Sequence, residues 1–282
     1  MRRFQEDRDL AINLRDLRLI NSFESSVQKV ELYAHKSVGK ILVINDELQH
    51  VEKWQALYHE PLVHLPSAFI PEVREVLILG GGSLYAASEV LRYPTVTRCT
   101  LVDHDPRVID LMVRFYPHAQ KVTEDCRFQY VEADALEFLA ATRQRFDLVI
   151  NDCLDAGEAS VTTGTSVYKT MTGCLSDAGA CSDLVYRHIF ECCSTHNARK
   201  ALRKAKCALS LVFVPEYPGT LHILMCWGDH VGQTLKATRN ECQQAWIKKP
   251  KSGPVLQFYN PAFLAFHLFI PPTVKGIWNS AT

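Results

Sequence analysis

The stretch VLILGGGSLYAASEVLR, from Val76 to Arg92, gives the strongest indication of how this protein folds. An apolar run leads into three consecutive glycines, and a segment with helical character follows them. Glycines placed after a first strand let backbone N–H groups approach a ligand closely, because they lack the Cβ atom that would block the turn. The stretch is typical of a loop that binds a nucleotide-like cofactor, although a tight turn without a ligand can have the same composition.

Downstream of this loop, short apolar runs alternate with amphipathic segments: TRCTLVDHD, PRVIDLMVRFYP, CRFQYVEAD, ALEFLAATR and FDLVINDCLDA. Near-continuous apolar strands separated by helices indicate a parallel sheet covered on both faces. Right-handed crossovers leave the carboxyl ends of such strands at one edge. The pattern predicts a doubly wound α/β domain in which the glycines, Asp103, Asp134 and Asp152 line one crevice. CALSLVFVPEYPG and TLHILMCWG predict a closing antiparallel pair.

The first seventy residues have a different pattern. A charged, helix-capable opening precedes VQKVELYAH, which alternates apolar and polar residues, and GKILVIND, a short apolar run ended by turn formers. YHEPLVHLPSAFI then predicts a helix that leads inward. We therefore expect residues 1–70 to form the helix-capable segment and a small β-hairpin domain, and residues 71–282 to form the cofactor-binding catalytic domain.

Composition restricts the classes of partner. The 31 Lys and Arg residues balance 31 Asp and Glu residues, so no overall field favours nucleic acid or an anionic membrane. The opening lacks the apolar core of a secretory signal, and no apolar run approaches the roughly 18 residues of a membrane span. We expect a cytoplasmic protein with a small-molecule partner. The ten cysteines form no C-x-x-C pair, which indicates reduced thiols and no metal site.

Acidic residues follow the predicted strands. Asp103 comes about twenty residues after the glycines, where a carboxylate commonly binds both hydroxyls of a ribose. Asp134 ends the next strand and could bind an adenine amino group with Ala135 beside it, although either acid could instead cap a helix. Asp152 and Asp155 follow the fourth strand and could be a base and a positioning group, or turn residues. The glycines, Asp103 and Asp134 each follow a predicted strand, and together they favour a crevice that binds a cofactor.

Eight sequence blocks in the same order resemble the spermidine synthase family of aminopropyltransferases, from about Ser26 to Lys275. The blocks are VQKVEL, GKILVINDELQHVEKWQALYHEPLVHLP, VLILGGG, TLVDHDPRVI, VEADALEFL, VINDCLDA, EYPGT and FYNPAFLAFHLFIPPTVK. The resemblance implies an N-terminal β-hairpin domain followed by a Rossmann-like class I methyltransferase domain. It also implies a homodimer, because members of the family are usually dimers or tetramers.

The resemblance further implies the residues of the site. Asp152 matches the acid that orients an incoming amine and helps to remove its proton, and Asp155 matches the second acid of that loop. Tyr217 matches a tyrosine that helps to place the acceptor, and His59 falls near the reacting centre. The residues expected to hold the adenosyl sulfonium cofactor are Gln28, Gln49, Gly80, Gly81, Gly82, Ser83, Asp103, His104, Asp134, Ala135 and Asp152.

Two departures from the family pattern bear on substrates. The family's glycine loop continues with an Asp that pairs with the ammonium of decarboxylated S-adenosylmethionine, whereas this chain has Ser83. Two like charges at about 4 Å repel by roughly 4 kcal/mol at an effective dielectric constant near 20, so an Asp would disfavour the carboxylate of intact S-adenosylmethionine and Ser83 would admit it. The family's acidic E-R-D-E reads EKWQ, with Trp54 and Gln55 in place of acids. Drift in a working aminopropyltransferase is the alternative explanation.

These departures favour transfer of a 3-amino-3-carboxypropyl or aminopropyl group to a non-polyamine acceptor, with methylthioadenosine leaving. A branch of the family in antibiotic biosynthesis, which modifies the phosphate of the peptidyl nucleotide microcin C, fits both departures. Three alternatives stay open: a polyamine synthase that uses the decarboxylated cofactor, a methyltransferase that releases S-adenosylhomocysteine, and a non-catalytic protein that binds the adenosyl group.

Overall fold

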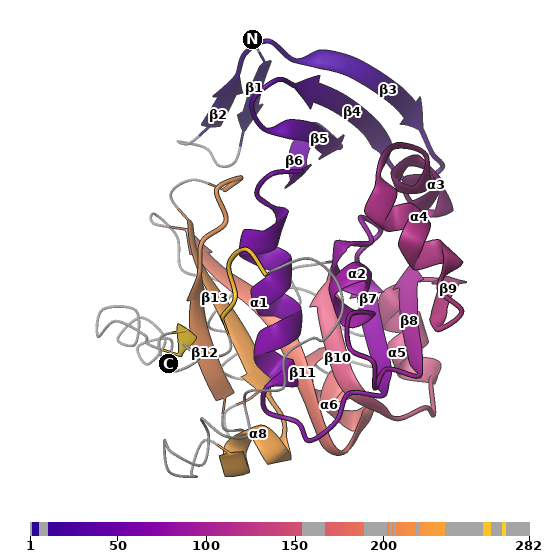
Figure 1. Ribbon diagram of the computed structural model, residues 1–282, viewed down its shortest axis with the longest axis vertical. Coiled ribbons are helices and arrows are strands. Elements are labelled where there is room, and N and C mark those ends of the chain that lie inside the picture. Colours follow the sequence, from indigo (N-terminus) through magenta and orange to yellow (C-terminus); the bar gives the residue numbers. More distant parts are fainter. Residues whose placement is uncertain are drawn as a thin grey trace.

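The computed structural model describes residues 2–5, 11–153, 167–188, 202, 205, 207–217, 220–234, 256–260 and 267–268 (Figure 1). A sheet of seven strands lies at its centre. Its strands are β7 (Glu75–Gly80), β8 (Arg98–Asp103), β9 (Phe128–Glu132), β10 (Phe146–Asp152), β11 (Leu175–His188), β12 (Cys207–Val212) and β13 (Thr220–Trp227).

The order of the strands is β12-β13-β11-β10-β7-β8-β9. The pairs β11·β10, β10·β7, β7·β8 and β8·β9 are parallel, whereas β13 runs antiparallel to both β11 and β12. This arrangement confirms the predicted, mostly parallel sheet and the closing antiparallel pair. The sequence did not predict β11, whose residues Ser176, Asp177, Ser182 and Asp183 interrupt the apolar pattern.

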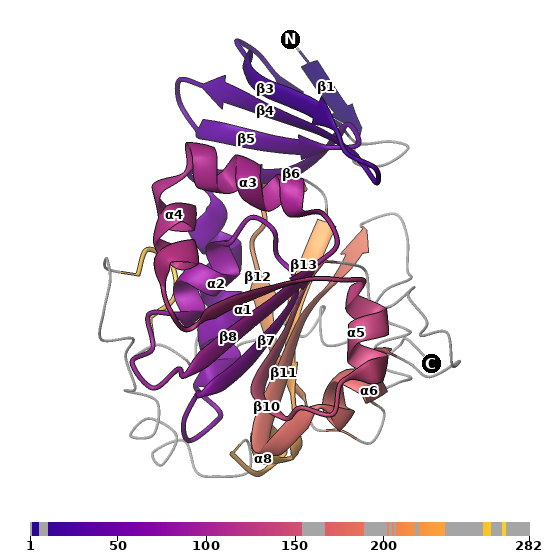
Figure 2. The same ribbon diagram turned by 90° about the vertical axis from the view of Figure 1, so that its right-hand side faces the viewer.

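Helices cover both faces of this sheet (Figure 2). Side chains alternate across a strand, so Val76 and Ile78 of β7 face one hydrophobic cluster while Leu77 and Leu79 face another. The first cluster includes residues of α1, α2, α3, α4 and α8, and the second includes residues of α5 and α6. The helices are α1 (Gln55–Ser67), α2 (Tyr85–Val90), α3 (Pro106–Phe115), α4 (Pro117–Glu124), α5 (Ala135–Ala141), α6 (Val167–Gly173) and α8 (Asp229–Thr234).

A small β domain precedes the α/β domain and lies at one end of it (Figure 1). Its four-stranded antiparallel sheet has the order β3-β4-β5-β6, and β1 and β2 form a separate antiparallel pair. The strands are β1 (Arg2–Gln5), β2 (Ala11–Leu14), β3 (Arg18–Glu24), β4 (Lys29–His35), β5 (Gly39–Ile44) and β6 (Glu47–Val51).

The helical character predicted for the opening is wrong, because the described residues there form the strands β1 and β2. Phe4 of β1 is fully buried and packs against Ile41, Val43 and Leu48. Burial in this cluster and pairing with β2 outweigh helix propensity, which contributes only about 0.7 kcal/mol per residue or less for ordinary residues. The predicted inward helix is confirmed as α1.

Helix α1 links the two sheets. It follows β6 directly and packs against α2, β10 and β11. Its Glu60 is 2% exposed and accepts hydrogen bonds of 2.7 to 2.8 Å from the backbone N–H groups of Gln257, Phe258 and Tyr259. One buried carboxylate thereby fixes a late segment of the chain against α1. Among the described helices, none has the length and apolar character required to cross a membrane.

Candidate active site

The glycine loop brings the ends of β7 and β10 into close contact. Gly80 and Gly81 have φ values of 70° and 77°. A Cβ atom on Gly80 would lie 2.0 Å from the Cβ of Cys153, and one on Gly81 would lie 2.8 Å from Oδ2 of Asp152. The N–H of Gly81 also donates to the carbonyl of Asp152 over 3.1 Å. Only glycine permits this approach, which sets Asp152 directly against the loop.

After the third glycine, the loop turns toward α4. Leu84 adopts a left-handed conformation with φ of 62° and donates its N–H to the carbonyl of Gly81. The carbonyl oxygen of Ser83 lies 2.9 Å from Nε2 of His118. Because a carbonyl can only accept, Nε2 carries the proton. This hydrogen bond ties Ser83 to α4.

Asp103 ends β8 beside the loop, as predicted. Its Oδ2 accepts from the N–H of Gly82 over 3.1 Å, and its Oδ1 accepts from the N–H of Asp105 over 3.0 Å. Burial raises the pKa of Asp103, and the two backbone hydrogen bonds oppose that rise. The cap of α3 is Asp105, not Asp103. Asp103 is thus oriented by backbone groups and keeps acceptor capacity on both oxygens. His104 beside it is exposed.

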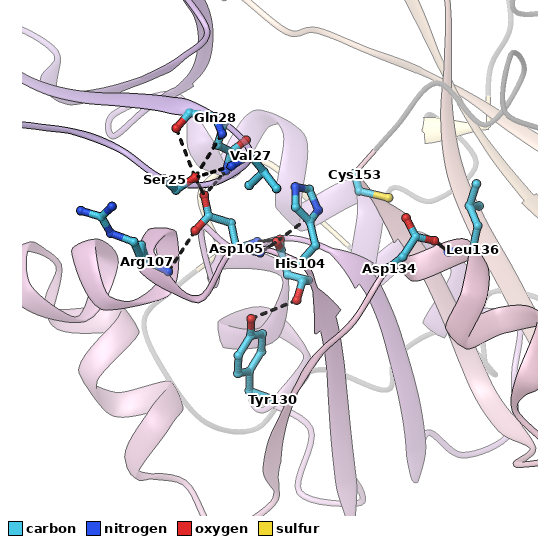
Figure 3. A network of polar contacts seen from close by, with 12 residues as sticks. Ser25, Val27, Gln28, His104, Asp105, Arg107, Tyr130, Asp134, Leu136 and Cys153 are labelled. Carbon is cyan, nitrogen blue, oxygen red and sulfur yellow. Dashed lines mark hydrogen bonds and ion pairs between the residues drawn. The ribbon is translucent and has the colours of Figure 1, made fainter.

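Asp134 lies at the same edge, where Figure 3 shows it close to Cys153. Its Oδ1 accepts from the N–H groups of Leu136 and Glu137 over 2.8 and 2.9 Å, so Asp134 caps α5. The cap interpretation therefore applies to this acid, although its exposed position also leaves it accessible at the edge. Ala135 is the first residue of α5.

The two predicted glutamines come from the small β domain. Nε2 of Gln28 donates to Oδ2 of Asp105 over 2.7 Å, which places Gln28 beside the end of β8 (Figure 3). Gln49 lies on β6, where its exposed side chain alternates with the buried Leu48 and His50. The structure brings Gln28 to the predicted edge, and it places Gln49 on the exposed side of its strand.

Asp152 has the most perturbed environment among the predicted residues. Its side chain is 6% exposed, and its Oδ1 accepts from the hydroxyl of Tyr58 over 2.8 Å. Oδ2 lies 4.0 Å from Nε2 of His59 and has no hydrogen-bond partner among the described residues. Burial raises the pKa of Asp152 to about 7; the hydrogen bond from Tyr58 opposes this rise and the charge of Asp103 adds to it. Tyr58 was not predicted as a site residue, although it directly precedes His59.

His59 faces Asp152 with an acceptor atom. Its Nδ1 lies 2.9 Å from the carbonyl oxygen of Gln55, so Nδ1 carries the proton and Nε2 of the neutral ring has a lone pair. Burial lowers the pKa of His59 to about 4. The two acceptors, Nε2 and Oδ2 of Asp152, can both bind an N–H donor placed between them. The pair is suited to an amine.

Tyr217 and Glu216 hold the loop after β12 against β6. The hydroxyl of Tyr217 donates to the carbonyl of Leu48 over 2.8 Å, and Glu216 accepts from the N–H of Val51 over 3.2 Å. Burial raises the pKa of Glu216 to about 7. Tyr217 therefore joins the two domains in this structure. Asp155 lies outside the described residues.

A cluster of histidine and tyrosine rings adjoins this centre, and His59 is its one predicted member. Tyr85 stacks on His118 at 3.7 Å, and it contacts His50 at 4.5 Å and His59 at 5.3 Å between ring centroids. Burial lowers the pKa of all three histidines, so their rings are neutral at pH 7. No sequence spacing reveals this cluster, because its members come from β6, α1, α2 and α4.

Glu52 is the acid that this chain keeps from the family's E-R-D-E motif, and a lysine balances its charge. Glu52 pairs with Nζ of Lys40 over 2.9 Å and accepts from the N–H of Lys40 over 2.8 Å. Nζ of Lys40 also lies 4.6 Å from the ring centroid of Tyr116. The Glu52–Lys40 pair therefore contributes no net charge.

The raised pKa of Asp152 predicts a pH-dependent stability. An unfolded Asp ionises near pH 4, whereas Asp152 ionises near pH 7, so the folded state binds the additional proton and loses stability as pH rises through this window. Asp152→Asn removes the buried ionisation. The variant should gain up to about 1.4 kcal/mol over wild type for each pH unit between 4 and 7. Urea unfolding of both proteins at several pH values measures this gain, and a pH-independent difference would contradict it.

Comparison with known proteins identifies the family. A family model described as "Spermine/spermidine synthase domain" matches residues 55–237, which is more than half of the chain. The chain belongs to the spermine/spermidine synthase family. The family match begins at α1 and extends past β13, so it includes the glycine loop, Asp103 and Asp152.

Individual relatives agree with this family. A polyamine aminopropyltransferase of Buchnera aphidicola is 35% identical over 128 residues, which cover 45% of this chain and 45% of that relative. A protein named putrescine N-methyltransferase 2, from Nicotiana attenuata, is 29% identical over 279 residues, which cover 96% of this chain and 74% of that relative. The crystal structure of spermidine synthase from Thermotoga maritima has a TM-score of 0.78 at 22% identity, over 93% of this chain and 87% of that one. This structure confirms the predicted class I methyltransferase-like fold.

Proposed function

We propose that this protein transfers an alkyl group from an adenosyl sulfonium cofactor to the amine of a small-molecule acceptor. Asp152 carries the proposal. Its carboxylate is buried, has a pKa of about 7 and is held by Tyr58 through one oxygen, while the other oxygen lies beside His59 with no hydrogen-bond partner among the described residues. A carboxylate with this pKa accepts a proton from an ammonium at neutral pH more readily than an ordinary Asp does.

The edge of the sheet fits the adenosyl group. Asp103 keeps acceptor capacity on both oxygens for ribose hydroxyls, and the glycine loop beside it has no side chains that would block a ligand. When bound, the cofactor supplies a carbon that its sulfonium already activates, so the protein provides alignment and exclusion of water. The residues proposed to hold it are Gln28, Gln49, Gly80, Gly81, Gly82, Ser83, Asp103, His104, Asp134, Ala135 and Asp152.

The acceptor is an amine in this proposal. A phosphate needs no base, and the relatives compared above give no support to the predicted peptidyl-nucleotide phosphate. Their names favour polyamines as acceptors. Neither the neutral rings around Tyr85 nor the Glu52–Lys40 pair adds a net charge that would hold a second ammonium. Comparing kcat/KM for putrescine with that for a monoamine of the same length tests the number of cations that the site accepts.

The donor is intact S-adenosylmethionine in this proposal, and a 3-amino-3-carboxypropyl group is transferred. Ser83 supports it, because no carboxylate at this position repels the carboxylate of the intact cofactor. Transfer of an aminopropyl group from the decarboxylated cofactor is the alternative, and it agrees with the names of the aminopropyltransferase relatives.

Methyl transfer is a second candidate, because the putrescine N-methyltransferase matches almost the whole chain. Analysis of the adenosyl product by mass spectrometry separates the two reactions. Propyl-group transfer releases methylthioadenosine, and methyl transfer releases S-adenosylhomocysteine. We expect methylthioadenosine from incubation with S-adenosylmethionine and an amine. Release of S-adenosylhomocysteine would replace this proposal with methyl transfer, and the absence of both products would indicate a binding protein.

Two features of the organisation also remain proposals. We propose the division into residues 1–70 and 71–282, which assigns α1 to the N-terminal unit although it packs on the central sheet. We also propose a homodimer, which light scattering of the purified protein would test.

A further inference from the structure

Asp105 connects the small β domain to the edge of the sheet (Figure 3). The residue is only 2% exposed. Oδ1 accepts from the N–H of Arg107 over 3.1 Å and so caps α3. Oδ2 accepts from the hydroxyl of Ser25 over 2.8 Å and from Nε2 of Gln28 over 2.7 Å. One carboxylate thus reaches two residues that are 80 and 77 positions away in the sequence.

The bond to Asp105 determines how the amide of Gln28 is oriented. A carboxylate only accepts hydrogen bonds, so the amide nitrogen of Gln28 must point toward it. Asp105 takes one N–H of the amide, so the amide oxygen, Oε1, is left to accept a hydrogen bond from a ligand. The second N–H of the amide is not used by Asp105.

The turn that carries Gln28 is fixed by the same contact. The hydroxyl of Ser25 accepts from the N–H groups of Val27 and Gln28 over 3.2 and 3.1 Å. Since this hydroxyl also reaches Asp105, the carboxylate positions the backbone of the turn as well as the side chain of Gln28.

Asp105 also contacts Asp103 through its backbone N–H group. The N–H of Asp105 donates to Oδ1 of Asp103, whose Oδ2 accepts from the N–H of Gly82. A continuous chain of hydrogen bonds therefore runs from Ser25 through Asp105 and Asp103 to the glycine loop. Two of the residues predicted to hold the cofactor, Gln28 and Asp103, therefore both contact Asp105.

We propose that Asp105 is a positioning residue that sets Gln28 as an acceptor toward the cofactor. This inference rests on the proposed function, because it assumes that the adenosyl group binds at this edge. Docking of the small β domain does not depend on Asp105 alone. Arg107 also donates to the carbonyl of Glu24, and its guanidinium lies 4.2 Å from the ring centroid of Phe23. Removal of the charge from Asp105 should alter the orientation of Gln28 without detaching the domain.

Asp105→Asn tests the proposal. The capping bond to Arg107 requires the oxygen of the introduced amide, so the NH2 group of that amide would face the NH2 group of Gln28 and force the glutamine amide to turn. We expect the Kd of methylthioadenosine, measured by calorimetry, to rise about tenfold, which corresponds to about 1.4 kcal/mol. In turnover assays KM for the cofactor should rise with kcat unchanged.

Two further variants separate positioning from stability. Asp147→Asn is the matched control, because Asp147 also accepts three hydrogen bonds, from the N–H groups of Arg74 and Glu75 and from Ser176, at the opposite end of β10. It should lower stability without changing the Kd. The double variant Gln28→Glu with Asp105→Asn restores a donor facing an acceptor and keeps the net charge, so it should recover most of the affinity.

The outcomes are distinct. Equal changes in Kd for Asp105→Asn and Asp147→Asn, or no recovery in the double variant, would overturn the positioning role. If wild type binds no adenosyl ligand, the proposed function fails. In that case, amide hydrogen exchange of the ligand-free proteins still tests whether Asp105 holds the turn that carries Gln28. Asp105→Asn should speed exchange at Val27 and Gln28, and unchanged exchange would overturn it.

Discussion

Replacement of Asp152 by Asn should lower kcat by about a thousandfold. The amide keeps the shape of the side chain and can still accept from Tyr58, but it cannot take a proton from an ammonium. Because Asp152 has a pKa of about 7, kcat/KM of wild type should fall as pH decreases below 7, where the carboxylate becomes protonated. Initial rates between about pH 5 and 9 measure both effects.

Tyr58→Phe provides the matched test of this assignment. The hydrogen bond from Tyr58 lowers the pKa of Asp152, so its loss should move the acidic limb of the pH profile to higher pH while the carboxylate remains. If the acidic limb of the pH profile has the same midpoint in Tyr58→Phe as in wild type, a group other than Asp152 titrates there. Near-normal turnover by Asp152→Asn would remove Asp152 from the chemistry.

Replacement of Ser83 by Asp should reverse the preference between the two forms of the cofactor. A carboxylate at about 4 Å from that of intact S-adenosylmethionine costs roughly 4 kcal/mol, and the same charge favours the decarboxylated form, which has only an ammonium. The ratio of the two Kd values should therefore change by up to about a thousandfold. Calorimetric titration with both compounds measures this ratio.

Ser83→Asn is the control, because Asn has the shape of Asp without its charge. We expect the ratio of the two Kd values to stay near that of wild type in this variant. The carbonyl of Ser83 is held by His118, so neither replacement needs to move the backbone of the loop. Equal changes in both variants would attribute the effect to size. Tighter binding of the decarboxylated form by wild type would contradict the choice of donor itself.

Local sequence patterns determined much of the central sheet and its edge. Apolar runs at β7, β8, β9 and β10 alternate with amphipathic segments, and this periodicity is visible without knowledge of any distant residue. The position of an acid directly after a strand also fixes the edge at which it lies. Asp103 and Asp152 could therefore be placed from sequence, as could the glycine loop. The small β domain was predicted as well, but its opening strand was not.

Tertiary contacts determined the remaining features. β1 is a strand because Phe4 is buried against β5 and β6, and β11 forms between two neighbours although its own pattern is irregular. Asp134 fits an adenine contact or a cap equally well from sequence, and only the folded structure shows that it caps α5. The ring cluster around Tyr85 requires four elements to meet, which no single window of sequence contains.

The order of strands and helices that makes the parallel sheet, and the acids at its edge, follow from the sequence alone because both depend on residues close together in the chain. The ionisation and orientation of the side chains at that edge depend instead on the folded chain. Asp152 has a pKa near 7 because α1 buries it and Tyr58 reaches it from 94 residues away, and Gln28 has its orientation because Asp105 faces it. Desolvation and hydrogen bonding depend on what surrounds a group in space, and these surroundings come from distant parts of the chain.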